Sequence, residues 1–283
     1  MILLPGDRFA KLKELIHEVQ INNLFARSVI EKHVTGEIFV DDIDNPKTIY
    51  VIHPYGMSLL FGNYSNVDFN NQFKSNISSQ TVGEITYEWL QTYPEGWDEV
   101  MNNLFGDMII KHSENNFSNG LIELNTRVNF NFNKEKYQRL KKKVISEFDL
   151  IVETTQVHFD LMPGSVIPMK FWDSSEDFLQ QGKGFTMLHN GEIASTAYSA
   201  YVHEDKLEIG IETIEKYRGL GLAELTCSRL IDYCIDNNLI PVWSCRYENI
   251  ASYNLAIKLG FEPTTMIPYY KIKKVKQAIG SRE

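Results

Sequence analysis

Hydrophobic and polar positions follow one another along this chain in patterns that predict both helices and strands. From Pro5 to His33, apolar residues recur at three- and four-residue spacing, which predicts a half-buried helix. Runs rich in β-branched and aromatic residues follow at 36–42, 47–54 and 57–63, separated by turn-forming residues. We therefore expect these three segments to form strands of a hairpin or meander.

The middle of the chain mixes polar, helical and extended patterns. Its segments are a loop-like polar stretch at 71–80, a helical pattern at 95–110, an alternating strand at 127–133 and a basic helix at 134–145. The pattern restarts near Ser146, so we place a domain boundary there. The sequence thus predicts an N-terminal α/β domain, residues 1–145, and a second domain, residues 146–283.

The second domain reads as alternating strands and helices, which predicts a mixed sheet of the α/β class. Its predicted elements are a strand at 151–159, a loop and helix at 166–182, a hairpin at 182–202 turning at His189–Gly191, a strand at 206–213, a helix from Ala223 to Cys234, a strand at 239–247, a helix at 250–259 capped by Asn249, and a final strand or hairpin at 261–275.

Two carboxylates share one face of the strand at 206–213. Because side chains alternate along a strand, Glu208 and Glu212 lie opposite Leu207, Ile209 and Ile211. Burial at such a face raises the pKa of a carboxyl toward working pH, which suits a proton acceptor. The alternative is a pair of solvated strand residues.

The segment 215–226, EKYRGLGLAELT, places two glycines between this strand and the following helix. The first N–H groups of a helix are unpaired and lie at the positive end of its dipole, so this turn predicts an anion site. Glycines let a phosphate approach the main chain closely. An ordinary helix entry is the alternative; the spacing fits neither the GxxxxGK[ST] nucleotide loop nor the three-glycine dinucleotide fingerprint.

The run from Arg218 to Ala223, RGLGLA, matches the pattern Q/R-x-x-G-x-G/A of the GNAT superfamily of acyl-coenzyme A-dependent N-acyltransferases. Residues 249–261, NIASYNLAIKLGF, resemble the downstream N-x-x-A-x-x-L-Y-x-K-x-G-F segment of that superfamily. The two motifs stand in the expected order, separated by one helix and one strand. The second domain is therefore identified as a GNAT domain.

The resemblance implies a binding mode for acetyl-CoA as co-substrate. Main-chain amides of the glycine loop would hold the pyrophosphate, Asn249 would bind the pantetheine arm besides capping its helix, and a main-chain N–H near Ile211 to Thr213 would polarise the thioester carbonyl. Arg218 either adds a phosphate contact or is a solvent-exposed flank. The residues so implied to bind coenzyme A are Ile211, Thr213, Arg218, Gly219, Leu220, Gly221, Leu222, Ala223 and Asn249.

The catalytic candidates are Glu208 and Glu212 as proton acceptors and Tyr253 as proton donor to the leaving sulfur. The tyrosine usual in the superfamily falls on Ala256 here, so Tyr253, one helical turn earlier, is the substitute, and Tyr247 is the alternative. Both tyrosines are equally consistent with packing roles. An acyl-cysteine at Cys245 is a further option, but core packing explains that residue more simply.

Composition narrows the functions that remain. A formal net charge of −9 argues against binding to nucleic acid or anionic membranes. The 3 cysteines show no metal-ligand spacing, and 7 scattered histidines form no metal motif, so we expect no metal. The short apolar N-terminus and the lack of a run of about 20 apolar residues predict a cytoplasmic protein.

The first domain carries no motif, yet its order of helix, strands, helix and strand loosely repeats that of the second, so a degenerate GNAT-like repeat is one interpretation. The layout resembles two-part GNAT proteins, among them the zwittermicin-resistance acetyltransferase. The expected function is transfer of an acetyl group from acetyl-CoA to a primary amine of a small molecule, by direct attack in a ternary complex. The alternatives are a non-catalytic acyl-CoA-binding regulatory module and an aminoacyl-tRNA-dependent transferase.

Overall fold

The computed structural model describes residues 1–78, 84–112, 121–141 and 149–276. By its internal contacts the chain forms two compact units, of which unit 1 comprises Met1–Arg127 and Ile267–Glu283, and unit 2 comprises Val128–Met266. They differ in extent from the predicted domains 1–145 and 146–283, because the long strands β7 (Ile122–Phe132) and β13 (Phe261–Lys276) each contribute to both. The predicted boundary lies outside the described residues and stays a prediction.

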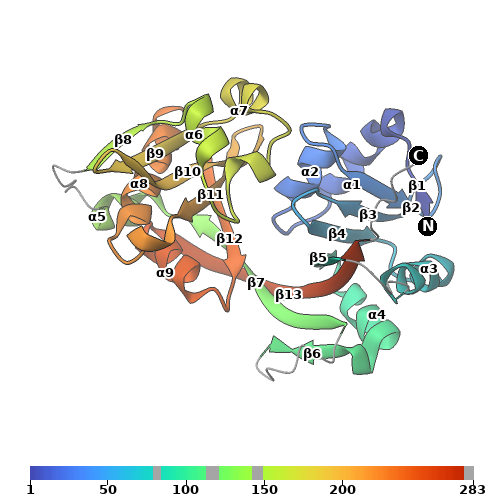
Figure 1. The fold of residues 1–283 in the computed structure, drawn as a ribbon. Coiled ribbons are helices and arrows are strands. Elements are labelled where there is room, and N and C mark those ends of the chain that lie inside the picture. The colour runs from blue at the N-terminus through green and yellow to red at the C-terminus, as the bar shows by residue number, and fades with distance from the viewer. Residues whose placement is uncertain (79–83, 113–120, 142–148, 277–283) are drawn as a thin grey trace. The chain divides into compact units, whose positions relative to one another are not determined.

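Unit 1 is a sheet with helices on both faces (Figure 1). Its strands run in the order β1-β2-β3-β4-β5-β13, and β6 pairs with β7. Its elements other than β7 and β13 are β1 (Ile2–Leu3), η1 (Gly6–Leu12), α1 (Lys13–His17), α2 (Leu24–Ile30), β2 (Glu37–Val40), β3 (Thr48–Ile52), β4 (Met57–Gly62), α3 (Val67–Ser78), β5 (Glu84–Tyr93), α4 (Gly96–Phe105), η2 (Gly106–Met108) and β6 (Ile109–Lys111).

The core of unit 1 lies between the sheet and the helices α3 and α4. Tyr50, Leu60 and Leu90 project from adjacent strands onto Phe73 and Trp97 of these helices. The predicted meander is confirmed, because β2, β3 and β4 pair antiparallel in sequence order. In contrast, β4 and β5 pair in parallel.

Unit 2 is a mixed sheet in the order β7-β12-β11-β10-β9-β8, with β13 beside β7. Strands β8 to β11 pair antiparallel, and β11 pairs in parallel with β12. Its elements other than β7 and β13 are α5 (Lys134–Leu140), β8 (Asp149–Glu153), α6 (Gln156–Leu161), η4 (Pro168–Lys170), α7 (Ser175–Gln181), β9 (Gly184–His189), β10 (Glu192–His203), β11 (Lys206–Thr213), η5 (Glu215–Tyr217), α8 (Leu222–Asp236), β12 (Ile240–Arg246) and α9 (Ile250–Lys258).

The two faces of the unit 2 sheet carry different side chains. Leu207 and Ile209 of β11 pack with Cys227, Leu230 and other residues of α8 in the core on one face. On the other face, η4 and the following residues contact β10, where the Phe171 ring lies 5.6 Å from that of Tyr198 and the Trp172 indole donates to Ser199 O at 2.8 Å. The alternation predicted for 206–213 is confirmed.

Several predicted segments need correction. The helix predicted at 95–110 ends at Phe105, and η2 and the strand β6 follow it. Residues 71–78 of the polar stretch predicted as a loop are helical, because α3 extends to Ser78 and its residues Phe73 and Ile77, one turn apart, are buried against the sheet. The strand predicted at 151–159 ends at Glu153, since Thr155 and His158 form a capping box that starts α6. The N-terminal helix predicted from Pro5 to His33 is broken into η1, α1 and α2.

Candidate active site

The parallel strands β11 and β12 part in the middle of the unit 2 sheet. Their register runs from Lys206–Ile240 to Glu208–Val242, although β11 continues to Thr213 and β12 to Arg246. Beyond this last pair β11 extends about 16 Å toward the glycine loop. Within the described residues, the main-chain groups of β11 that point toward β12 after Glu208 therefore have no partner strand.

The glycine loop has the conformation that its sequence predicts. Gly219 and Gly221 have φ values of +83° and +80°, which disfavour any residue with a Cβ. A Cβ built on Gly219 would meet no atom within 4 Å, so the loop faces open space there. Gly221 caps α8 without a side chain, leaving the first N–H groups of a helix that ends only at Asp236 available to an anion.

Both candidate carboxylates are buried on the same side of β11. Glu208 is 5% exposed and Glu212 8% exposed. Between them the Tyr198 ring lies over Gly210, where a Cβ would fall 2.5 Å from Cζ of that ring. Glu208 is also the last residue of β11 to pair with β12, so it lies at the point where the strands part.

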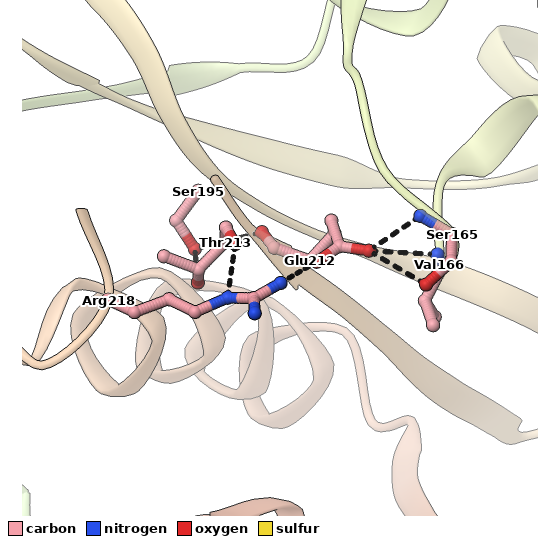
Figure 2. A network of polar contacts seen from close by, with 6 residues as sticks. All are labelled: Ser165, Val166, Ser195, Glu212, Thr213 and Arg218. Atoms are coloured by element: carbon pink, nitrogen blue, oxygen red, sulfur yellow. Dashed lines mark hydrogen bonds and ion pairs between the residues drawn. The ribbon is translucent and has the colours of Figure 1, made fainter. Parts of the chain in front are cut away.

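Glu212 belongs to a polar network that Figure 2 shows from close by. Its Oε2 atom accepts hydrogen bonds from the main-chain N–H groups of Ser165 and Val166, both at 2.9 Å, and its Oε1 atom lies 3.4 Å from Nη2 of Arg218. The sequence does not mark Ser165 and Val166 as partners of Glu212. The Pro163-Gly164 pair indicates a turn before these residues, but it does not indicate that the turn contacts Glu212.

Arg218 and Thr213, both implied to bind coenzyme A, contact each other. The Arg218 Nε–H donates to the carbonyl of Thr213 at 3.1 Å, while the Thr213 hydroxyl lies 2.9 Å from that of Ser195. The Arg218 side chain is 62% exposed, so its guanidinium lies at the surface beside the loop. Ile211, by contrast, packs partly against the core.

The turn before the glycine loop is attached to the β9–β10 hairpin. The Tyr217 hydroxyl donates to Glu192 at 2.6 Å, and Lys216 forms an ion pair with the same carboxylate. The hydrogen bond from Lys216 lowers the pKa of Glu192. The hairpin turns at Asn190 and Gly191 with positive φ values of 51° and 81°, as the sequence predicts.

Helix α9 presents Asn249 and Tyr253. Asn249 caps the helix, its Oδ1 accepting the Ser252 N–H at 3.2 Å, so the capping part of the prediction is confirmed. The Tyr253 ring lies 5.5 Å from Phe130 and edge-on to Tyr247 at 5.4 Å. Ala256, at the position of the usual tyrosine, is fully buried in the core.

The three cysteines are buried and form no disulfide. Burial raises the pKa of the Cys234 thiol to about 12 and that of Cys227 further, so both stay protonated near neutral pH. Cys245 packs in the core with Trp243. Among the described residues, no group of three or more His, Cys, Asp or Glu is arranged to hold a metal ion, and no helix is long and apolar enough to cross a membrane.

Comparisons with known proteins place the chain among N-acetyltransferases. The model of the GNAT acetyltransferase family matches residues 13–270. The chain is 27% identical over 273 residues to the uncharacterized N-acetyltransferase YdfB of Bacillus subtilis (strain 168), covering 94% of this chain and 97% of that protein. These matches span both units.

Solved structures share the fold. A GCN5-related N-acetyltransferase-like protein from Streptococcus suis 89/1591 superposes with a TM-score of 0.68 at 21% identity, covering 94% of this chain and 99% of that one. A tandem GNAT protein from the clavulanic acid biosynthesis pathway gives a TM-score of 0.59 at 7% identity, covering 98% and 99%.

The mixed sheet, the parted parallel pair and the glycine turn that opens a helix accompany the family match of a GNAT-type N-acetyltransferase. The chain belongs to the GNAT acetyltransferase family, because the family match covers most of its length. The residues present fit acyl-CoA: Gly219 leaves open space at the main chain, and the helix N-terminus behind it suits a phosphate.

Proposed function

We propose that this protein transfers an acetyl group from acetyl-CoA to a primary amine of a small molecule, by direct attack in a ternary complex. The observation that carries the proposal is the parting of β11 and β12 at Glu208 and Val242, which leads from a buried carboxylate to the glycine loop. The family in general uses acetyl-CoA, which supports this choice of co-substrate; the tandem GNAT neighbour is described as a structure without AcCoA.

The glycine loop and α9 supply the groups that hold the co-substrate. Main-chain N–H groups from Leu220 to Ala223 bind the pyrophosphate, and the Asn249 amide, exposed at the start of α9, binds the pantetheine arm. A main-chain N–H of β11 between Ile211 and Thr213 polarises the thioester carbonyl, because β12 no longer lies on that edge. Acetyl-CoA itself supplies the activated acetyl thioester.

Glu208 is the preferred proton acceptor of the two candidates. A general base must face the amine, and both oxygens of Glu212 are directed at donors from Ser165, Val166 and Arg218. Glu208 instead lies where the strands part, at the inner end of the proposed binding region. It takes the proton that the amine must lose for attack.

Tyr253 is the proposed proton donor to the sulfur. Its ring is held by Phe130 and Tyr247, while its hydroxyl makes no hydrogen bond to any described residue and so has its proton to give. Ala256 has no proton to donate. This assignment replaces the usual tyrosine by one on the preceding turn of the same helix.

The test is calorimetric titration with acetyl-CoA, followed in the same preparation by thiol release with a panel of small amines. Gly221→Asp puts a carboxylate where the phosphate binds and should abolish binding. Gly191→Asp is the matched control, because Gly191 has nearly the same φ (+81°), in open space of a hairpin turn. Absence of binding by the wild-type protein contradicts the proposal, and binding without thiol release for any amine contradicts its catalytic part.

A further inference from the structure

Glu212 connects two loops that are far apart in the sequence. Its Oε2 atom holds the N–H groups of Ser165 and Val166, in the loop between α6 and η4, and the Ser165 hydroxyl lies 3.4 Å from the same oxygen (Figure 2). Its Oε1 atom pairs with Arg218, the residue directly before Gly219. One buried carboxylate therefore contacts both the loop over the Glu208 face and the start of the glycine loop.

The loop between α6 and η4 is shaped around this carboxylate. A Cβ on Gly164 would fall 2.6 Å from Cγ and from Oε2 of Glu212, and Gly164 has a φ of +139° that other residues rarely adopt. The backbone at Gly164 thus lies so close to the Glu212 side chain that no Cβ fits between them. Two charge-assisted hydrogen bonds to adjacent N–H groups then fix the direction of the loop.

Arg218 transmits the same restraint to the glycine loop. Its guanidinium bridges the Glu212 carboxylate and the Thr213 carbonyl, so it closes the chain from Thr213 to Arg218 into a short ring. This segment ends at Arg218, directly before Gly219, where the proposed phosphate-binding main chain begins. An arginine held in this way orients the loop from its first residue, without itself having to contact the phosphate.

We propose that Glu212 is a positioning residue, which holds the loop at 164–166 through Oε2 and the glycine loop through Oε1 and Arg218. This inference rests on the proposed function, in which Glu208 is the proton acceptor. It assigns different roles to two carboxylates on one strand face. The loop at 164–166 thereby covers the side of the sheet from which Glu208 projects.

Substitutions separate the two halves of the network. Glu212→Gln keeps a carbonyl oxygen for Ser165 and Val166 but loses the ion pair with Arg218. Arg218→Gln loses the same ion pair and leaves the Glu212 carboxylate in place. Since Arg218 is mostly exposed, each should raise KM for acetyl-CoA only about two- to fivefold, with kcat within about twofold. The double variant should be no worse than Arg218→Gln alone, because that single variant already removes the ion pair that Glu212→Gln removes. Glu215→Gln, an exposed neighbour with the same change of charge, is the control and should leave KM unchanged.

Hydrogen exchange tests the other half without any ligand. Glu212→Ala should speed amide exchange at Ser165 and Val166 at least about tenfold, while Arg218→Gln leaves it unchanged. A fall in kcat of about 100-fold or more in Glu212→Gln, with KM unchanged, would instead make Glu212 the proton acceptor and overturn the proposal. Unchanged exchange in Glu212→Ala would overturn it as well.

The failure of this inference is distinguishable from failure of the proposed function. If wild-type protein does not bind acetyl-CoA, the proposed function is wrong, whereas the exchange data still decide whether Glu212 holds the loop. If the wild type, Glu212→Gln and Arg218→Gln all bind acetyl-CoA equally well, the proposed restraint on the glycine loop is refuted, while the proposed function is not.

Discussion

Glu208 of β11 lies opposite Val242 of β12 at the last position where these strands pair. The carboxylate at this point is buried, yet it borders the region where the edge of β11 is open. In the proposed function, the base therefore lies at one end of this open edge and the phosphate site lies beyond its other end.

Replacing Glu208 by Gln should lower kcat by about 100-fold or more, because the amide keeps the shape of the side chain but accepts no proton from the amine. Affinity for acetyl-CoA, measured by calorimetry, should change little. Thiol release with a saturating amine gives kcat. An unchanged kcat would show that the amine proton leaves by another route.

Gly219→Ala should weaken acetyl-CoA binding at least about tenfold, since the added methyl group stands where a phosphate must approach the main chain. The same change should cost about 1 kcal/mol of folding free energy, because φ is +83°. Gly191→Ala shares that cost, with φ at +81° and open space around it, but should bind normally. Equal weakening by both variants would indicate general destabilisation instead.

Calorimetry should find a single acetyl-CoA site per chain, in unit 2. In unit 1 the corresponding parallel strands β4 and β5 stay paired as far as Phe61 and Tyr93, so they do not part. At the start of α3 the Asn66 side chain accepts the Phe69 N–H at 3.1 Å, so a side chain fills the place that Gly221 leaves open at α8. A stoichiometry of two would refute this account of unit 1.

Tyr253→Phe should lower kcat about 100-fold while keeping the ring contacts with Phe130 and Tyr247. Tyr247→Phe removes a hydroxyl from the other ring of the pair and should leave kcat within about twofold. If the two variants have the same kcat, the proton for the sulfur comes from elsewhere, solvent included.

Local patterns in the sequence predicted the elements that build the site. The alternation in β11 placed Glu208 and Glu212 on one face, and the paired motifs located the glycine turn and the Asn249 cap, because each depends on neighbours a few residues away. The fold class followed from the order of these elements.

Contacts between distant segments could not be predicted in this way. Ser165 and Val166 meet Glu212 across 46 to 47 residues, and nothing in either stretch marks the other as its partner. The sequence predicted a strand through Thr155, where the structure has a capping box, because the apolar neighbours of this residue also fit a strand. The strands β7 and β13 extend through both units, which composition alone does not reveal.

His53 in unit 1 makes the stability of the protein depend on pH. It is fully buried, and burial lowers its pKa from 6.5 to about 3. Between these values the unfolded chain binds a proton that the folded chain does not, so stability is lost as the pH falls below 6.5. From pH 6.5 to pH 5 the loss should be about 2 kcal/mol, measurable by urea unfolding at several pH values.

His53→Asn should remove this part of the pH dependence. The His53 ring nitrogen Nδ1 accepts the Tyr55 N–H at 3.0 Å, and an asparagine oxygen can accept the same bond in the turn. The variant therefore keeps the turn but has no group to protonate, so its stability should change by about 2 kcal/mol less than that of the wild type between pH 6.5 and 5. Equal slopes for wild type and His53→Asn would mean that the folded protein accommodates the charged imidazole, against the burial seen here.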